Sequence, residues 1–396
     1  MNPTYDVIIV GAGPAGATAA YFLGNAGRRV LVIEKATQPR YKTCGGGLSL
    51  SFLKSQFSFS FDPIIETDVE AIIYAFGESC VTVPLSTSDM RMVMRDRFDA
   101  YLLAHAQAEV WQGISVRRVT ETSTGVMVET SDGRTASGAF LIGADGANSV
   151  VAHAVGLRRG KRLVAAIEME VSVPVEVMDR FAKKPVFIFG EVRYGYAWIF
   201  PKANHLSVGI AALHPKPGEL QAILHRVMPR YGISVAGCQM HGHPIPIYTG
   251  REAITTRRVL LAGDAAGLAD PFSGEGIRLA ITSGRLAAEA ILADQPEQYE
   301  KMISRQIGFS QFWGMGVSWL FYHFQRACFS LGASNPFVTR AFIDLLSGRT
   351  RYPAVILRIF VTLPLFLVVE ALIQLAGLVG GADKMRWIRN KIYLTG

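Results

Sequence analysis

The chain opens on an apolar run, a glycine-rich turn and a helix of small residues. The stretch YDVIIV, which begins at residue 5, is uninterrupted in the way of a buried parallel strand. GAGPAG follows, and the small residues after it predict a helix from Pro14 to Asn25. The next apolar run, RRVLVIE, ends at Glu34. This order predicts a strand–turn–helix–strand unit at the start of the fold.

Two later apolar runs end in a glycine and an aspartate. FLIGADGANS contains Asp145-Gly146, and RRVLLAGDAAGLADPFSGEGIRLAI passes through Gly263-Asp264 into an irregular loop. A helix is expected from about Gly276. An aspartate after a strand can serve only as a helix cap. Because both runs occur together with the N-terminal unit, we interpret them as parts of a site for a large dinucleotide, FAD.

Alternating patterns between these motifs predict antiparallel strands. Residues 69–85 have the pattern of a hairpin, and VFIFGEV, YAWIFP and LSVGIAAL, within residues 186–213, predict successive strands of one sheet above the cofactor. Residues 115–139 also alternate, and they predict a small meander inside the FAD domain. After Leu279 the pattern becomes helical.

The predicted fold class is α/β, with α+β character overall. It combines a Rossmann-like FAD-binding domain, an antiparallel β-sheet substrate domain and a helical C-terminal region. The expected boundaries are 1–68, 86–160 and 255–300 for the FAD domain, 69–85 and 161–254 for the substrate domain, and 301–396 for the helical region. No second GxGxxG unit follows a predicted strand, so a separate NAD(P)H domain is not expected.

The first glycine unit has a specific chemistry. Gly11 would make the turn, Gly13 would let the backbone approach a pyrophosphate, and Gly16 would allow close helix packing. The helix N-terminus supplies amides and a positive dipole to the phosphates. Glu34, about 20 positions beyond the glycines, can accept hydrogen bonds from ribose hydroxyls.

Composition adds a lipidic or anionic partner to this picture. The 396 residues are 50% hydrophobic and 18% charged, with a formal charge of +8, a mean hydropathy of +0.26 and a pI near 9.3. A membrane face or a prenyl diphosphate suits these values. A large core beneath a solubilising positive surface would produce the same values. We expect no nucleic-acid partner.

Cysteine and histidine placement indicates neither a disulfide framework nor a metal site. Cys44, Cys80, Cys238 and Cys328 are scattered, which favours a reducing cytoplasm, and no signal peptide precedes the first strand. The eight histidines have no ligand spacing, and we interpret His241 and His243 as surface or loop residues.

The C-terminal region contains an apolar run of 11 residues, IFVTLPLFLVV, at 359–369. Pro364 interrupts this run, and an extension to the length of a membrane span would bury Glu370. We favour helices that lie on a membrane or close a lipid tunnel; ordinary core and a true span stay open. A basic cluster that suits an anionic surface follows at Lys384, Arg386, Trp387, Arg389 and Lys391. Because every cofactor motif lies upstream, removal of the chain after Arg349 is expected to leave FAD binding largely intact.

The glycine motifs resemble the FAD-binding pattern of flavoproteins of the p-hydroxybenzoate hydroxylase type. CGGGLS, which begins at Cys44, and YAWIFPK, followed by SVGIA, resemble the geranylgeranyl reductase family over about residues 4–300. The resemblance implies that Asp264 contacts the ribityl and pyrophosphate region, that the loop 270–276 lies near the isoalloxazine, and that Arg95 lies over the cofactor. The expected residues for non-covalent FAD are Gly11, Gly13, Ala15, Gly16, Glu34, Lys35, Cys44, Gly45, Gly46, Arg95, Asp145, Gly146, Gly263, Asp264, Gly274, Gly276 and Ile277.

The same resemblance implies a reductase that saturates C=C bonds of a polyprenyl lipid or prenyl diphosphate. A hydride from flavin N5 needs a proton donor on the other side of the alkene, and the mostly protonated thiol of Cys44 can supply it. Cys44, Tyr196 and Trp198 are therefore the expected catalytic residues, and the glycines near Cys44 would make room for the isoalloxazine. The expected substrate-binding residues are Gly47, Tyr196, Trp198, Phe200, Pro201 and Lys202.

Several alternatives stay open at this point. Cys44 could be a small residue tolerated in a tight glycine loop, and the aromatic residues could form an ordinary sheet face. A monooxygenase or halogenase of the same fold is a second enzyme class, and a flavin protein that binds lipid without catalysis is a third. The external reductant is either NAD(P)H or ferredoxin. We expect a cytoplasmic protein with peripheral contact at the cytoplasmic membrane face.

Overall fold

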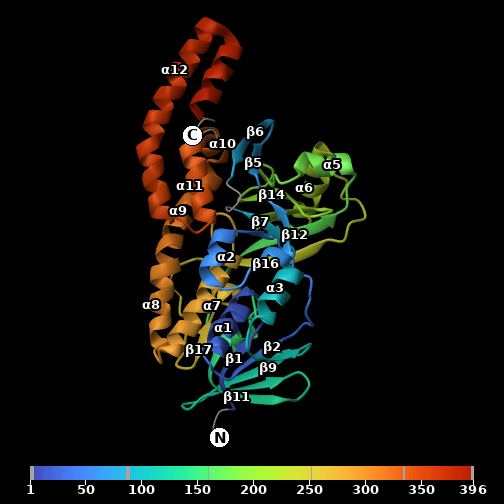
Figure 1. Cartoon of the computed structure of the whole chain (residues 1–396), viewed down its shortest axis with the longest axis vertical. Coiled ribbons are helices and arrows are strands. Elements are labelled where there is room, and N and C mark those ends of the chain that lie inside the picture. The colour runs from blue at the N-terminus through green and yellow to red at the C-terminus, as the bar shows by residue number, and fades with distance from the viewer. Residues whose placement is uncertain (1–3, 86–89, 159, 251, 333–334, 394–396) are drawn as a thin grey trace.

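Two large β-sheets and a group of C-terminal helices make up the fold (Figure 1). The computed structural model describes residues 4–85, 90–158, 160–250, 252–332 and 335–393, with side chains described as far as Ile373. The sheets alternate with helices in the N-terminal half, and helices alone follow residue 276. The predicted α/β class with a Rossmann-like FAD domain is confirmed.

The first sheet is built on the N-terminal unit. Its order is β8-β2-β1-β11-β10-β9, with β17 also paired to β11. These strands are β1 (Tyr5–Val10), β2 (Val30–Glu34), β8 (Glu109–Gln112), β9 (Val116–Glu121), β10 (Val126–Thr130), β11 (Thr135–Gly143) and β17 (Val259–Leu261). β8, β2, β1, β11 and β17 are parallel. β10 pairs antiparallel with the start of β11, and β9 pairs antiparallel with β10. The loops that follow the parallel strands therefore meet at one edge of the sheet.

Helices cover this sheet because its central strands are apolar on both faces. β2 is buried throughout, as the continuous hydrophobic run predicts. The helices of this part are α1 (Pro14–Asn25), α2 (Leu50–Gln56), α3 (Arg95–Ala104), α4 (Val150–Ala154) and α7 (Ile277–Leu292). α1 has the predicted bounds. α1 and α7 cross closely at Gly284. A Cβ atom at this position would clash with the carbonyl oxygen of Ala15, so only glycine fits without a shift of the helices.

The second sheet has the order β16-β12-β15-β14-β13-β5-β6. Its strands are β5 (Ala71–Phe76), β6 (Ser79–Pro84), β12 (Arg162–Val171), β13 (Val186–Phe189), β14 (Gly195–Pro201), β15 (Leu206–Leu213) and β16 (His241–Ile247). The predicted hairpin at 69–85 is β5–β6. On β14, Ala197 and Ile199 pack into the cluster beneath α5 (Val175–Phe181) and α6 (Glu219–Val227), whereas Trp198 and Phe200 point to the opposite face.

A small third sheet connects the two large ones. It consists of β3 (Gly47–Leu48), β7 (Arg91–Val93) and β4 (Ile65–Asp68) in that order. The short 3₁₀ segments are Asp62–Ile64, Met228–Tyr231, Gly263–Ala266 and Pro296–Gln298. β3 directly follows the cysteine at position 44 and its glycines, so its pairing with β7 fixes one end of that loop.

The C-terminal helices run along one side of the molecule (Figure 1). They are α8 (Tyr299–Ile303), a π-helical turn (Ser304–Gly308), α9 (Phe309–His323), α10 (Gln325–Gly332), α11 (Pro336–Leu346) and α12 (Tyr352–Tyr393). The predicted apolar run therefore lies within one long helix, with Pro364 inside it. The basic cluster at residues 384–391 lies outside the part of the chain whose side chains are described.

These helices also hold the loop 270–276. The Tyr352 hydroxyl, fully buried at the start of α12, donates to both carboxylate oxygens of Asp270 at 2.9 and 3.0 Å. From α9, the Tyr322 hydroxyl donates to the Phe272 carbonyl at 2.7 Å. Removal of the chain after Arg349 would take Tyr352 from Asp270, so the expectation that such a truncation leaves FAD binding largely intact stays a prediction.

We predict that Gly284→Ala destabilises the protein, although alanine normally stabilises a helix interior by about 1 kcal/mol. The new methyl group would push α7 away from Ala15, and overpacking of this kind costs about 1–3 kcal/mol. Gly316→Ala is the control, because nothing lies within 4 Å of the position of its Cβ atom on α9. Urea unfolding should show opposite changes in the free energy of unfolding; equal changes would contradict the close crossing.

We also predict that Tyr352→Phe weakens FAD binding and lowers stability. The variant keeps the ring and removes a donor from a buried carboxylate, which costs about 1–3 kcal/mol. Tyr101→Phe is the matched control, because its hydroxyl donates to the Ser60 carbonyl away from the cavity. Thermal unfolding and FAD titration of the apoprotein would measure both effects. An unchanged FAD dissociation constant would show that α12 does not support the loop.

Candidate active site

One cavity of about 1310 Å³ runs between the two large sheets. Its walls come from the loops after β1, β2, β11 and β17, from one face of β14, and from α9. Nearly all of the predicted site residues line it. The predicted residues absent from its lining are Gly16, Pro201 and Lys202.

The turn between β1 and α1 is shaped for a diphosphate. Gly11 has a φ of 99°, and a Cβ atom there would clash with the Ala144 carbonyl oxygen. A Cβ atom on Gly13 would instead point into open space, with Arg40 Nη2 the nearest neighbour at 3.8 Å. α1 begins at Pro14 without a side-chain cap, so the amides of its first turn remain for an anion. The residues present therefore fit the pyrophosphate of FAD.

A chain of buried charges continues from this turn. Glu34 accepts a hydrogen bond from the Ala12 amide at 2.7 Å and lies 3.5 Å from Arg40 Nε. Arg40 also contacts Asp99 at 3.3 Å, and Asp99 binds Arg95 through two hydrogen bonds of 2.9 Å. Burial alone would lower the pKa of Arg95, but the carboxylate of Asp99 raises it above its ordinary value. A fixed positive charge therefore faces the cavity.

Asp145 makes local contacts that a helix cap would make. Its carboxylate accepts hydrogen bonds from the Ser149 hydroxyl at 2.5 Å and from the Val151 amide at 3.1 Å, at the start of α4. Burial raises the pKa of Asp145. The carboxylate thus has structural partners, while the residue and the adjacent Gly146 line the cavity.

A second polar cluster surrounds Asp264. His243 Nε2 lies 3.9 Å from its carboxylate and has no hydrogen-bond partner among the described residues. His241 and His243 belong to β16, so their interpretation as loop residues is wrong, and His243 lines the cavity. Lys42 also lines it, and burial together with Arg95 lowers the pKa of Lys42 to about 8.

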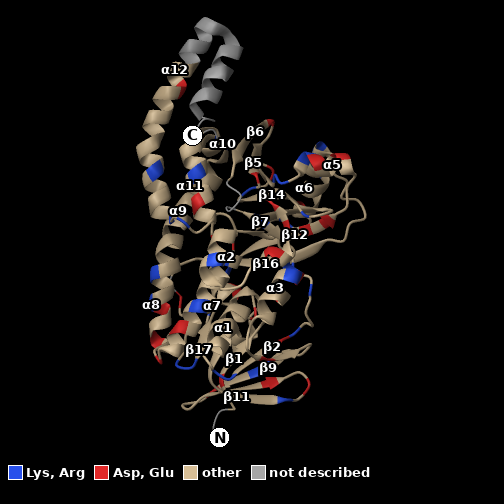
Figure 2. Ribbon diagram, in the orientation of Figure 1, with Lys and Arg blue, Asp and Glu red and all other residues tan. Residues whose placement is uncertain are grey.

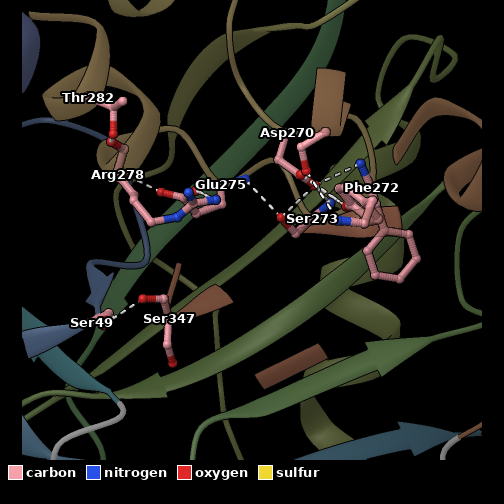
Figure 3. A network of polar contacts seen from close by, with 10 residues as sticks. Ser49, Asp270, Phe272, Ser273, Glu275, Arg278, Thr282 and Ser347 are labelled. Atoms are coloured by element: carbon pink, nitrogen blue, oxygen red, sulfur yellow. Dashed lines mark hydrogen bonds and ion pairs between the residues drawn. The ribbon is translucent and has the colours of Figure 1, made fainter. Parts of the chain in front are cut away.

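The loop 270–276 is held rigidly by its own side chains (Figure 3). Asp270 Oδ1 accepts hydrogen bonds from the Phe272 amide at 3.0 Å and from the Ser273 amide at 2.8 Å. Glu275 Oε1 accepts from the Arg278 amide at 2.6 Å, at the first turn of α7. Gly274 has a φ of 70°, which a residue other than glycine adopts only with strain. The loop therefore presents a fixed backbone to the cavity.

Cys44 lies in the middle of the cavity wall, in the loop of residues 43–47, here called the cysteine loop. Its amide donates to Glu168 Oε2 at 2.5 Å, and its sulfur accepts from the Gly46 amide at 3.4 Å. Glu168 is fully buried and also accepts from the Ser207 hydroxyl at 2.5 Å. Burial raises the pKa of Glu168, and Ser207 opposes that rise. Glu168 thus positions Cys44 through its backbone.

Lys202 supports the cysteine loop and does not face the cavity. Its buried ammonium group donates to the carbonyl oxygens of Gly45 at 2.7 Å and Val93 at 2.9 Å. The proposal that Lys202 binds substrate is therefore wrong, and Pro201 is likewise buried outside the lining.

Protein atoms fill the space that the glycines of this loop provide. A Cβ atom on Gly45 would lie 2.5 Å from the Phe200 ring, and one on Gly46 would clash with the Val93 carbonyl oxygen. Packing within the protein therefore requires glycine at both positions, and the expectation that they make room for the isoalloxazine stays a prediction. They allow the cysteine loop to pack against β14 and β7.

Aromatic side chains of β14 form the cavity wall next to the cysteine loop. Tyr196, Trp198 and Phe200 line the cavity from one face of β14, as the alternation predicts. Trp198 lies over Gly209, where any Cβ atom would clash with its ring, and the Tyr196 hydroxyl donates to the Ser273 carbonyl at 2.5 Å. The wall is therefore apolar in its middle and tied to the loop 270–276 at one point.

Sequence reasoning missed Lys42, Glu168, Ser207 and Tyr352. Each is a single polar residue to which the motifs assign no role, and each acquires its role from a partner far away along the chain. The only available signal was the position of Ser207 in SVGIA, beside the motif that carries the family resemblance.

Comparisons with known proteins agree with this geometry. The FAD binding domain family matches residues 4–54 and 65–204. The geranylgeranyl diphosphate reductase of Rhodobacter capsulatus is 30% identical over 73% of this chain and 75% of its own length. The menaquinone reductase of Mycolicibacterium smegmatis is 29% identical over 76% of this chain and 79% of its own length.

A solved structure, a geranylgeranyl bacteriochlorophyll reductase-like protein from Thermoplasma acidophilum, has the same fold. Its TM-score is 0.73 at 24% identity, with 90% of this chain and 95% of that chain covered. These similarities confirm the predicted FAD cofactor and the predicted resemblance. The chain belongs to the geranylgeranyl reductase family of FAD-dependent oxidoreductases.

Proposed function

We propose that the protein saturates C=C bonds in the polyprenyl chain of a lipid or prenyl diphosphate. The observation that carries this proposal is the continuity of the cavity. Residues that fit FAD line one end, and Cys44 and the aromatic wall of β14 line the rest. An extended apolar chain can therefore lie between the wall and the cofactor.

Each residue group has a part in this reaction. Bound FAD supplies a hydride, which an isolated alkene accepts only if a proton is added to its other carbon. Cys44 is the proposed proton donor, since the residue lines the cavity and Glu168 fixes its backbone. Tyr196, Trp198 and Phe200 hold the chain and exclude water from the developing positive charge. An external reductant, NAD(P)H or ferredoxin, would restore the reduced flavin.

The main alternative is a flavin monooxygenase or halogenase, since one fold can serve several reactions. A halogenase-like tryptophan-rich stretch would carry a tryptophan where this chain has Tyr196. Sequence similarity to reductases over most of the chain favours reduction. An anaerobic experiment separates the two: the flavin is reduced with dithionite, prenyl lipids are added in turn, and mass spectrometry follows the gain of two hydrogens. Oxygen-dependent product formation alone would favour the alternative.

A second proposal concerns the contact of α12 with a membrane. One described helical segment, Tyr352–Ile373, is long and apolar enough to cross a membrane, and only 11% of its apolar window is buried. Leu357 and Phe360 are 64% and 75% exposed, and Figure 2 shows few charged residues along this part of α12. This exposure argues against the alternative that the apolar segment is part of an ordinary hydrophobic core. We infer that α12 lies on the face of an anionic bilayer, with exposed Arg351 and Arg358 at the headgroups.

We predict that Cys44→Ala retains FAD and loses alkene reduction by roughly a hundredfold or more, the usual effect of removing a general acid. Cys44→Ser should lie between the wild type and the alanine variant. Cys80→Ala, an exposed cysteine on β6, is the control. Single-turnover reoxidation of the reduced flavin by a prenyl lipid is the measurement. Wild-type turnover in Cys44→Ala would show that Cys44 has only a packing role.

We predict that Leu357→Glu combined with Phe360→Glu abolishes binding to vesicles that contain phosphatidylglycerol and leaves the FAD content unchanged. Val175→Glu is the control, because Val175 is 70% exposed on α5. Flotation of the wild type should weaken with salt, because the Debye length falls from about 10 Å at 0.1 M to about 3 Å at 1 M. Unchanged flotation of the double variant would overturn the proposal. Extraction by detergent only would indicate a true span.

A further inference from the structure

The far end of the cavity opens between the β13–β14 turn and α9. Tyr194 from the turn and Trp319, Tyr322 and His323 from α9 line the cavity there. A second cavity of about 340 Å³ adjoins it and shares Arg193, Tyr322 and His323 in its lining. These shared residues therefore form a mouth between the interior and the surface.

Contacts across this mouth fix its shape. Tyr194 and His323 Nε2 lie 3.1 Å apart, and His323 Nδ1 lies 2.7 Å from the Trp319 carbonyl oxygen. Since a carbonyl only accepts, Nδ1 carries a proton, and in the neutral imidazole the Tyr194 hydroxyl donates to Nε2. Arg193 donates to the same hydroxyl at 3.2 Å, and its guanidinium group lies 4.9 Å from the Tyr194 ring centre. Tyr194 adopts a φ of 53°, an uncommon value for a bulky residue.

The positive charge of Arg193 is uncompensated at this position. Neighbouring Arg226 and Arg230 both pair with Glu191, at 3.2 and 2.5 Å. Arg193 is exposed, and no carboxylate pairs with it among the residues that the structure describes. An anion that approaches the mouth therefore meets a free guanidinium group.

Strand pairing brings further cations to the same end of the sheet. The Leu213 amide donates to the Tyr194 carbonyl at 3.0 Å, and Leu213 is opposite Val164 on β12. Arg162, two residues before Val164, and Lys216, three residues after Leu213, are both exposed and line the cavity. Glu219 is the acidic residue nearby in the lining, and its carboxylate accepts from the Lys216 amide at 2.7 Å.

On the other side of the mouth, α9 is apolar. Phe312 is 61% exposed and Trp319 is 58% exposed, and Trp319 also lines the cavity. A lipid substrate would thus meet an apolar helix surface on one side and cations on the other. This arrangement suits a molecule with an anionic head and a long hydrocarbon chain.

We propose that this mouth is the headgroup site for a prenyl phosphate or diphosphate, with Arg193 as its principal ligand and Arg162 and Lys216 as supporting charges. The inference rests on the proposed function and adds the class of headgroup. The hydrocarbon chain would extend inward from Tyr194 along Tyr196 and Trp198 toward Cys44. Because Arg193 touches neither the FAD end of the cavity nor Cys44, it affects binding and not the chemical step.

The test compares three probes with the oxidised holoenzyme: geranylgeranyl diphosphate, neutral geranylgeraniol and inorganic pyrophosphate. Arg193→Glu should weaken binding of the diphosphate by roughly 10- to 100-fold, the range of a lost charge-assisted hydrogen bond. Its affinity for geranylgeraniol should be unchanged. In turnover with dithionite-reduced flavin, Arg193→Glu should raise KM for the diphosphate and leave kcat unchanged. Arg118→Glu, on the distant strand β9, is the control, because Arg118 is 70% exposed.

The outcomes separate this proposal from the proposed function. If the wild type reduces prenyl lipids but Arg193→Glu binds the diphosphate as the wild type does, the headgroup site is wrong and the reductase stands. If both probes lose affinity equally, Arg193 shapes the mouth and does not bind the anion, which also overturns the proposal. If only pyrophosphate binds, and Arg193→Glu weakens that binding, the site is for a free anion and the proposed prenyl headgroup site is wrong. If the wild type reduces no prenyl lipid, the proposed function itself fails.

Discussion

The architecture depends on one constraint: irregular backbone around a large cavity must find hydrogen-bond partners in side chains. The cysteine loop and the loop 270–276 both border the cavity, and neither continues a long strand or helix. A buried backbone group without a partner costs about 1–3 kcal/mol. Lys202 donates to the Gly45 carbonyl of the first loop and to the Val93 carbonyl of the adjacent β7, and Asp270 accepts from two amides of the second loop. These buried charged residues therefore fix the backbone of both loops at the cavity wall.

This constraint explains why the C-terminal helices belong to the site. Asp270 is itself buried, and it needs the hydroxyl of Tyr352 as a further donor. α9 adds Tyr322 and Ser318, whose hydroxyls bind the carbonyls of Phe272 and Pro271 at 2.7 and 2.8 Å. The helices with the most exposed apolar surface are thus bonded to the loop nearest the expected flavin.

The spacing of apolar, polar and glycine residues predicted the features that are determined by residues close together in the sequence. The bounds of α1, the hairpin β5–β6 and the single face of Tyr196, Trp198 and Phe200 all follow from periodicity and glycine chemistry. The roles of Lys202, Glu168 and Tyr352 did not follow from pattern, because their partners are 157, 124 and 82 residues away. A lysine just after a strand resembles an exposed one until Gly45 and Val93 are placed beside it.

The cavity changes character along its length, and this order constrains the chemistry. Near Gly13 and Arg95 it offers amides and fixed cations, which suit a diphosphate and a negatively charged cofactor. Farther along, the lining includes the thiol-bearing Cys44 and the aromatic rings of β14. At Arg193 it becomes cationic again. The proposed function and the proposed headgroup site would together place the phosphates of cofactor and substrate at opposite ends of the cavity, with the reactive parts of both molecules near Cys44.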